Sequence, residues 1–131
     1  MSCDNKQDGY PVRAFGRPVK RYCQFLEITD CPELIARYVE SHDREHAWKE
    51  IIDGIRQVGI LEMELYILGN KVVMIVEAPL DFEWKTAMAQ LAALPRQAEW
   101  ESFVARMQGC DPAVPSDSKW QLMDRMFYLY D

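Results

Sequence analysis

The chain has 131 residues, a length that fits one domain of ordinary size, and 49% of them are hydrophobic. Its formal net charge is −6, which argues against nucleic acid as a partner because phosphate binding needs a concentrated positive patch. No apolar run approaches the roughly 20 residues that span a bilayer, and the first residues lack the apolar core of a secretory signal.

The first 19 residues are polar and carry the turn-forming residues Gly9, Pro11, Gly16 and Pro18. We expect residues 1–19 to form a flexible N-terminal extension, either as a tail or draped over the body. Residues 20–131 show no further boundary and no sequence repeat, so we expect them to form a single domain.

The first strand is expected at Lys20–Ile28, where two sets of side chains alternate. Asp30, Pro32 and Glu33 then have the pattern of a helix start, with Asp30 as the capping residue. This first helix is expected to run to about His42.

Charged residues at Asp43–Glu45 break the apolar stripe of the first helix. A second helical segment follows and is expected to end before Gly59. Its apolar face comprises Trp48, Ile51, Ile52 and Ile55.

Two further strands are expected at Leu61–Leu68 and Lys71–Ala78. Gly69-Asn70 joins them, and two turn residues between alternating apolar runs are a strong hairpin signal. Asp81 is placed to cap the next helix, which Pro95 interrupts. The apolar stripe of that helix comprises Trp84, Ala87, Met88 and Leu91.

A last helical segment after Pro95 carries Trp100, Phe103, Val104 and Met107 on one face. Residues 109–118 form a turn-rich loop, and Lys119–Tyr130 is expected to be the last strand. The element order βαββαβ predicts an α+β fold of the ferredoxin-like class, with helices on one face of a four-stranded sheet.

The other face of this sheet has a mixed set of side chains, which includes Glu64, Tyr66, Val73 and Ile75. A half-apolar open face of this kind is usually covered by a second copy of itself. We therefore expect a two-fold homodimer in which the two sheets face each other. Cys3, Cys23, Cys31 and Cys110 show no CxxC pairing, which favours free thiols in a reducing cytoplasm.

The stretch from His42 to His46 has the letters H-x-x-E-H, which is the signature of the inverted zinc peptidases. Histidines four residues apart can hold zinc, and Glu45 would then serve as a base. Three points weigh against this alternative. The chain is small for a peptidase, the charged break interrupts the helical turn, and a third ligand has no obvious motif downstream.

Tyr38 and His42 lie four residues apart on the stripe of the first helix that should face the core. They are either core residues bonded to backbone groups or the wall of a ligand pocket in which His42 carries protons. Glu99 and Trp100 present a similar choice. Trp100 is a core residue or a pocket wall for a sugar, whose hydroxyls need partners such as a carboxylate.

Four stretches of the chain together resemble the L-rhamnose mutarotase family. They are ARYVESHDREHAWKEI, GILEMELYILGNKVVMIVE, QAEWESF and KWQLMDRMFYL. The resemblance covers about residues 20–130, and the HD..H.W and KW.LM.. segments are similar to a branch associated with L-fucose catabolism.

The resemblance implies a dimeric α/β barrel and an enzyme that interconverts the anomers of L-rhamnose or L-fucose without a metal or organic cofactor. It implies that His42 is the proton donor and that Tyr38 contacts the substrate. Met63 stands where the rhamnose enzymes have a tyrosine, and Glu99-Trp100 stands where they have a pair of tryptophans. Both departures affect substrate-binding positions and so leave the sugar open.

A pyranose changes anomer by opening to the aldehyde and closing on the other face, which needs one acid and one base. The imidazole of His42 suits one role because the reference pKa of histidine is ~6.5. The second role falls to Tyr38, Glu99 or a bound water. A dimer of the same fold that binds a small molecule without turnover is the alternative from another functional class.

Overall fold

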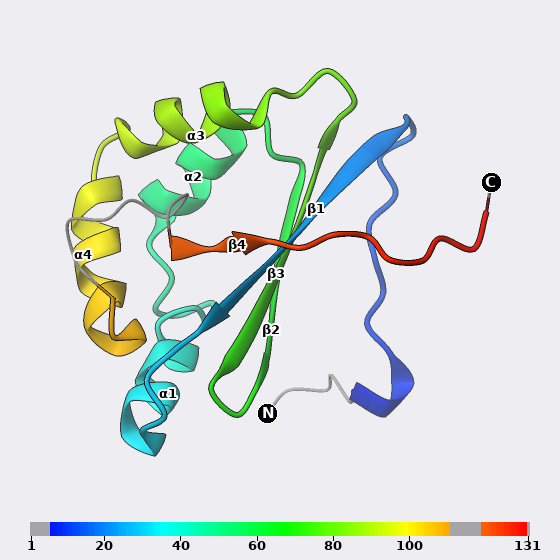
Figure 1. Ribbon diagram of the computed structural model, residues 1–131. Coiled ribbons are helices and arrows are strands. Elements are labelled where there is room, and N and C mark those ends of the chain that lie inside the picture. Colours follow the sequence, from blue (N-terminus) through cyan, green and yellow to red (C-terminus); the bar gives the residue numbers. More distant parts are fainter. Residues whose placement is uncertain (1–5, 111–118, 131) are drawn as a thin grey trace.

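A four-stranded antiparallel sheet organises the chain, and its helices lie to one side of it (Figure 1). The computed structural model describes residues 6–110 and 119–130. The strands are β1 (Val19–Glu27), β2 (Glu62–Leu68), β3 (Lys71–Pro79) and β4 (Gln121–Leu122), in the spatial order β2-β3-β1-β4. The helices are α1 (Pro32–Glu40), α2 (Lys49–Gln57), α3 (Trp84–Ala92) and α4 (Gln97–Gln108), and a 3₁₀ turn, Lys6–Asp8, precedes β1. The predicted α+β fold with a ferredoxin-like order is confirmed.

The predicted hairpin is present and joins β2 to β3 through Gly69-Asn70. Gly69 has a φ of 59°, which glycine adopts without the strain that a side chain would add. Asn70 also ties the hairpin to the end of β1, because its Nδ2 donates to the carbonyl oxygen of Ile28 at 3.0 Å. The turn therefore fixes the register of β2, the edge strand that forms one wall of the pocket described below.

The core lies between the sheet and the helices. Alternate residues of β3 are buried on this side, and the side chains that meet them come from β1, α3 and α4. Full burial of each large apolar side chain contributes about 1.5–3 kcal/mol. The residues at the centre of this core include Leu26, Val72, Val76, Leu91, Val104 and Met107.

Both predicted helix caps are wrong by one or two residues. Pro32 is the first residue of α1, and the residue before a proline is held in an extended conformation, so Cys31 takes the cap position in place of Asp30. A turn between Pro79 and Phe82 delays α3, and Glu83 is its cap in place of Asp81. Neither cap residue makes a side-chain capping bond.

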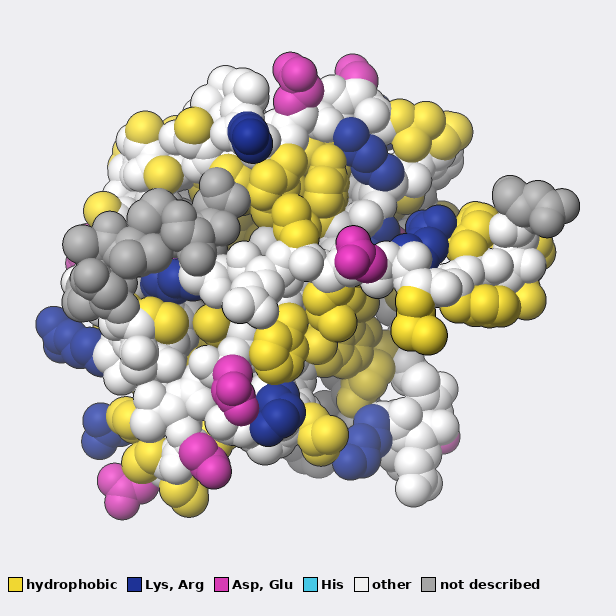
Figure 2. Space-filling view, viewed as in Figure 1, with side chains coloured by type: hydrophobic (Ala, Val, Ile, Leu, Met, Phe, Trp, Pro, Cys, Tyr) yellow, Lys and Arg dark blue, Asp and Glu magenta, His cyan; other side chains and the backbone are white. Residues whose placement is uncertain are grey.

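The predicted last strand is mostly wrong. Only Gln121–Leu122 pairs with β1, and the amide of Met123 makes one further bond to the carbonyl oxygen of Cys23. The chain then leaves the sheet edge and projects from the body (Figures 1 and 2). Its apolar side chains are exposed, to 97% for Met126 and 73% for Phe127. The alternating sequence thus predicted an extended chain, but within one copy this chain has no strand to pair with.

The described part of the N-terminal extension contacts the body. The ring of Tyr10 meets the ring of Tyr66 edge-on at 5.8 Å, and Arg13 and Phe15 line the pocket described below. The domain boundary near residue 19 stays a prediction. Residues 111–118 of the predicted loop lie outside the described residues. Among the helices that are described, none is long and apolar enough to cross a membrane.

Candidate active site

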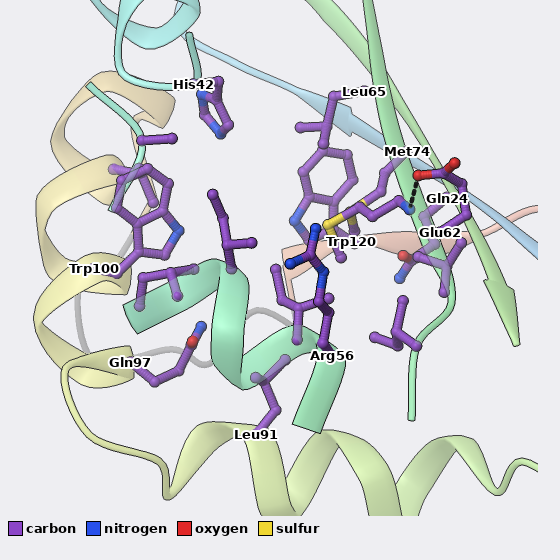
Figure 3. Close-up of a pocket in the computed structure, with 18 of the residues that line it drawn as sticks. Gln24, His42, Arg56, Glu62, Leu65, Met74, Leu91, Gln97, Trp100 and Trp120 are labelled. Carbon is purple, nitrogen blue, oxygen red and sulfur yellow. Dashed lines mark hydrogen bonds between the residues drawn. The ribbon is translucent and has the colours of Figure 1, made fainter. Parts of the chain in front are cut away.

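A pocket of about 700 Å³ lies between the sheet and the helices (Figure 3). Its size falls within the range that is usual for small-molecule sites. Every main element except β4 contributes to its wall. The polar residues that line it are Arg13, Gln24, Tyr38, Ser41, His42, Arg56, Glu62, Gln97, Glu101 and Gln108.

His42 lies just beyond the end of α1, and the backbone of that helix holds its ring. The imidazole Nδ1 is 2.7 Å from the carbonyl oxygen of Tyr38 and 3.1 Å from Ser41 Oγ. The hydroxyl of Ser41 donates to the same carbonyl at 2.7 Å. A carbonyl oxygen only accepts hydrogen bonds, so Nδ1 carries the proton. Nε2 of the neutral ring is therefore a proton acceptor.

The aromatic rings beside His42 decide which form of its imidazole is present. Tyr38 and Trp100 each approach it edge-on, with centroids 4.7 Å and 5.4 Å away. His42 is an exposed residue that also lines the pocket, and these rings remove part of its solvation. This desolvation lowers the pKa of His42 below its ordinary value, against the opposing effect of the bond to the Tyr38 carbonyl. The imidazole is accordingly a neutral base near pH 7.

Tyr38 is buried in the floor of the site, and its hydroxyl has a defined direction. Lys119 Nζ donates to Gln108 Oε1 at 3.0 Å, which turns the amide nitrogen of Gln108 toward the phenol. That nitrogen donates to the Tyr38 oxygen over a long 3.4 Å. The phenol accepts this bond, so its own hydrogen is available to a ligand. Burial raises the pKa of Tyr38 to about 12, which keeps the phenol protonated.

A buried ion pair between Lys119 and Glu101 holds the lysine that orients the Gln108 amide. Lys119 Nζ lies 2.8 Å from Glu101 Oε1, and Gln97 Nε2 donates to the other carboxylate oxygen at 2.9 Å. The lysine side chain is 1% exposed and the glutamate side chain is 11% exposed. Sequence analysis missed these residues. Gln97, Glu101 and Gln108 repeat at helical spacing on the face of α4 that also carries Val104, and polar residues on that buried face were the available signal.

The structure brings together most of the substrate-binding residues that the sequence predicted. Tyr38, His42, Met63 and Trp100 all line the pocket. Glu99 does not line it. The side chain of Glu99 is 60% exposed and forms an ion pair with the guanidinium of Arg96.

Trp48 also lines the pocket, and sequence analysis assigned it only to a helix face. Its ring meets Trp100 at 5.2 Å and Phe103 at 5.3 Å. The guanidinium of Arg96 lies over the Trp48 ring at 4.2 Å and bonds to Glu50 at the start of α2. These contacts form an aromatic wall beside His42, held between α2 and α4.

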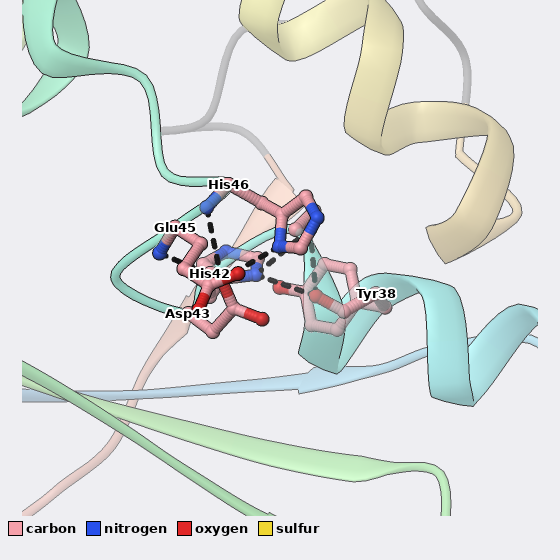
Figure 4. Close-up of polar contacts among 6 residues, drawn as sticks. Tyr38, His42, Asp43, Glu45 and His46 are labelled. Atoms are coloured by element: carbon pink, nitrogen blue, oxygen red, sulfur yellow. Dashed lines mark hydrogen bonds and ion pairs between the residues drawn. The ribbon is translucent and has the colours of Figure 1, made fainter.

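The zinc alternative needs a continuous helical turn from His42 to His46, and this stretch is not helical. An exposed turn around the Asp43 carboxylate takes its place (Figure 4). That carboxylate accepts from His46 Nδ1 at 2.7 Å, which raises the pKa of His46. The Nδ1 atoms of the two histidines thus have separate partners. Within residues 6–110 and 119–130, no group of three potential metal ligands is found.

The pocket combines a proton acceptor, a hydroxyl donor and an aromatic wall. His42 Nε2 accepts, the Tyr38 hydroxyl donates, and Trp48 and Trp100 offer flat apolar surface. This set suits a small ring compound that carries hydroxyl groups and exchanges protons.

Comparisons with known proteins agree with this chemistry. The family model for L-rhamnose mutarotase matches residues 21–129. An L-fucose mutarotase of Xanthomonas campestris is 31% identical over 111 residues, which cover 85% of this chain and 89% of that protein. A UPF0734 protein of Dictyostelium discoideum is 28% identical over 113 residues, with coverage of 86% and 89%. The crystal structure of an L-rhamnose mutarotase from Formosa agariphila superposes with a TM-score of 0.63 at 18% identity and covers 85% of this chain and 99% of that one, which indicates a shared fold.

Proposed function

The chain belongs to the L-rhamnose mutarotase family, and we propose that its pocket opens and closes the ring of a 6-deoxy-L-hexose with His42 as base and Tyr38 as acid. A mutarotase is an isomerase that interconverts the α and β anomers of a sugar. The observation that carries the proposal is the pairing of an unprotonated imidazole nitrogen with a phenol hydrogen in one pocket.

Ring opening moves two protons. His42 Nε2 takes the proton of the anomeric hydroxyl while the bond between the anomeric carbon and the ring oxygen breaks. The Tyr38 hydroxyl gives its proton to the ring oxygen, which becomes the free C5 hydroxyl. After rotation about the bond between C1 and C2 turns the aldehyde, the phenolate takes back the proton of the C5 hydroxyl as its oxygen attacks the other face of the carbonyl, and the protonated imidazole gives its proton to the carbonyl oxygen. Atoms and charges balance, and the enzyme ends as it began.

Tyr38 fits the acid role better than the alternatives from sequence analysis. Its hydroxyl accepts a bond from Gln108, which leaves its hydrogen for the substrate. A phenol is more acidic than an aliphatic hydroxyl, so transfer to the ring oxygen is favourable even with the pKa raised to about 12. Glu99 has no place in the pocket wall. Acid–base catalysis of this kind contributes about 10²–10⁴-fold.

The relatives named above make L-fucose and L-rhamnose the two leading substrates. Both carry a methyl group on C5, next to the ring oxygen. Met63, Leu65 and Trp100 line the pocket and offer the apolar surface that a methyl group needs. Anomer exchange measured by saturation-transfer NMR on both sugars tests the proposal. Binding of either sugar without faster exchange would instead support the non-catalytic alternative.

The active unit that we propose is a homodimer joined through its sheet faces. On the face away from the helices, Phe25, Val73 and Ile75 are half-buried within one copy. The C-terminal segment, which projects from the edge of this sheet, adds exposed apolar side chains, among them Phe127 and Leu129. A second copy would cover both surfaces. We place the protein in the cytoplasm, and the described cysteines, Cys23, Cys31 and Cys110, are free thiols there.

A further inference from the structure

Gln24 is a polar residue in a position that normally holds an apolar one. It lies on β1, a central strand, with its side chain on the buried face of the sheet. Its neighbour on β3 is Met74, and the next residue in the same row is Leu65 on β2. Gln24 is only 2% exposed. An amide among such neighbours needs a specific explanation.

The carbonyl oxygen of this amide has no hydrogen-bond partner. Gln24 Oε1 is the buried side-chain atom without a partner among the described residues. Buried polar groups are nearly always paired, since an unpaired acceptor loses its solvation without compensation. Gln24 also lines the pocket. A hydroxyl group of a ligand in the pocket can therefore supply the missing bond.

The position of Gln24 relative to His42 indicates which part of a sugar it meets. Figure 3 shows His42 beside Trp100 on one side of the pocket and Gln24 beside Met74 on the other. In the reaction proposed above, His42 must reach the anomeric hydroxyl. In a pyranose ring, C4 lies opposite the anomeric carbon, between C3, which carries a hydroxyl, and C5, which carries the methyl group. A group on the far wall therefore meets the hydroxyls of C3 and C4.

We propose that Gln24 binds the C4 hydroxyl of the sugar and selects its configuration. This inference rests on the proposed function and adds the residue that sets specificity. L-Rhamnose and L-fucose have the same configuration at C3 and C5 and opposite configurations at C2 and C4. Of these two differences, only C4 lies on the side of the ring that faces Gln24.

A set of four 6-deoxy-L-hexoses allows the effects of the C2 and C4 configurations to be measured separately in one experiment. L-Rhamnose and 6-deoxy-L-talose differ only at C4, as do L-fucose and L-quinovose. L-Rhamnose and L-quinovose differ only at C2, as do L-fucose and 6-deoxy-L-talose. We measure kcat and KM for anomer exchange with all four sugars. The ratio of kcat/KM within each pair then gives two C4 ratios and two C2 ratios.

The test variant is Gln24→Met, which keeps the length of the side chain and removes its amide. Loss of one neutral hydrogen bond changes kcat/KM by about tenfold. We expect the wild type to prefer one C4 configuration by about this factor and the variant to lose that preference. The change should lie in KM, because the C4 hydroxyl does not react. The two C2 ratios should not move.

Matched controls make every outcome decisive. Gln121→Met changes an exposed glutamine on β4 and should alter neither ratio. Removal of an unpartnered buried oxygen should leave Gln24→Met folded, and Gln24→Leu gives a second variant with the same expectation. Unchanged C4 ratios in a folded variant, a shift in the C2 ratios instead, or a wild type without C4 preference would overturn the inference. A wild type that accelerates exchange of none of the four sugars would overturn the proposed function itself.

Discussion

The imidazole Nδ1 of His42 lies 2.7 Å from the backbone carbonyl oxygen of Tyr38. The hydrogen bond that sets the tautomer of the imidazole thus comes from the backbone of α1, while the hydroxyl of Tyr38 is bonded to Gln108. The two groups that we propose as base and acid stand one helical turn apart, and each has its own hydrogen-bond partner. A change in the phenol leaves the tautomer of the imidazole as it is, so the two roles can be separated by mutation.

Tyr38→Phe removes the proposed acid and keeps the base in place. We expect kcat for anomer exchange to fall about 10²-fold, since a water molecule would protonate the ring oxygen less well. The fold should persist, because the aromatic ring still fills its site. Tyr66→Phe is the matched control: Tyr66 donates to Glu64 on the outer face of β2, and its loss should leave kcat unchanged. Full activity of Tyr38→Phe would remove Tyr38 from the chemistry.

The two histidines should titrate on opposite sides of the ordinary value of ~6.5. Burial lowers the pKa of His42, and the carboxylate of Asp43 raises the pKa of His46. A pH titration of the imidazole resonances by NMR measures both, and His46→Gln assigns them by deletion. If His42 titrates above ~6.5, the lowering of its pKa by desolvation is contradicted.

The same shift has a consequence for stability. Because the pKa of His42 is lowered on folding, the unfolded chain binds this proton more tightly. The contribution of His42 to stability is present above its unfolded pKa and is lost as the pH falls through its folded pKa. The pKa of His46 is raised on folding, so its contribution to stability is present below its unfolded pKa and is lost as the pH rises through its folded pKa. Urea unfolding of His46→Gln at several pH values should therefore show a loss of stability on acidification below ~6.5 that is absent when His42 is also replaced.

Lys119→Met should destabilise the protein strongly. It leaves the carboxylate of Glu101 buried without its partner, a change that typically costs about 3–5 kcal/mol. Lys49→Met breaks the exposed ion pair with Asp53 and should change stability far less, because water screens an exposed pair. Urea unfolding monitored by circular dichroism compares the two. Equal stability of both variants would mean that the buried pair does not hold α4 in place.

Ile75→Lys should separate the proposed dimer. Ile75 lies at the centre of the sheet on the face away from the helices, and it is half-buried in one copy. A charge there would be desolvated at an interface between two sheets. Light scattering coupled to size-exclusion chromatography should find a dimer for the wild type and a monomer for the variant. Leu80→Lys, which changes an exposed leucine beyond β3, should remain a dimer.

Much of the fold follows from local patterns in the sequence. Alternation of apolar residues located β1, β2 and β3, and Gly69-Asn70 located their hairpin. These signals work because a strand with one buried face needs period-two burial. The prediction of the last strand was mostly wrong for a related reason. Alternation predicts an extended chain but does not indicate which strand it pairs with.

Only part of the candidate site could be predicted from the sequence. Tyr38 and His42 stood out because a phenol and an imidazole occupied an apolar stripe. Glu101 and Lys119 did not, because their pairing joins α4 to a segment beyond the loop, and no local pattern reports such a contact. Glu99 was predicted from its place beside Trp100, but neighbours in the sequence of a helix do not share a face.

The central claim is that His42 moves the protons in this pocket, and saturation transfer between the two anomeric resonances of L-fucose and L-rhamnose tests it directly. Wild-type protein should accelerate the exchange of at least one sugar. His42→Ala should return it to the uncatalysed rate with an unchanged circular dichroism spectrum, while His46→Ala should keep the full rate. Exchange at the wild-type rate in folded His42→Ala would contradict the account.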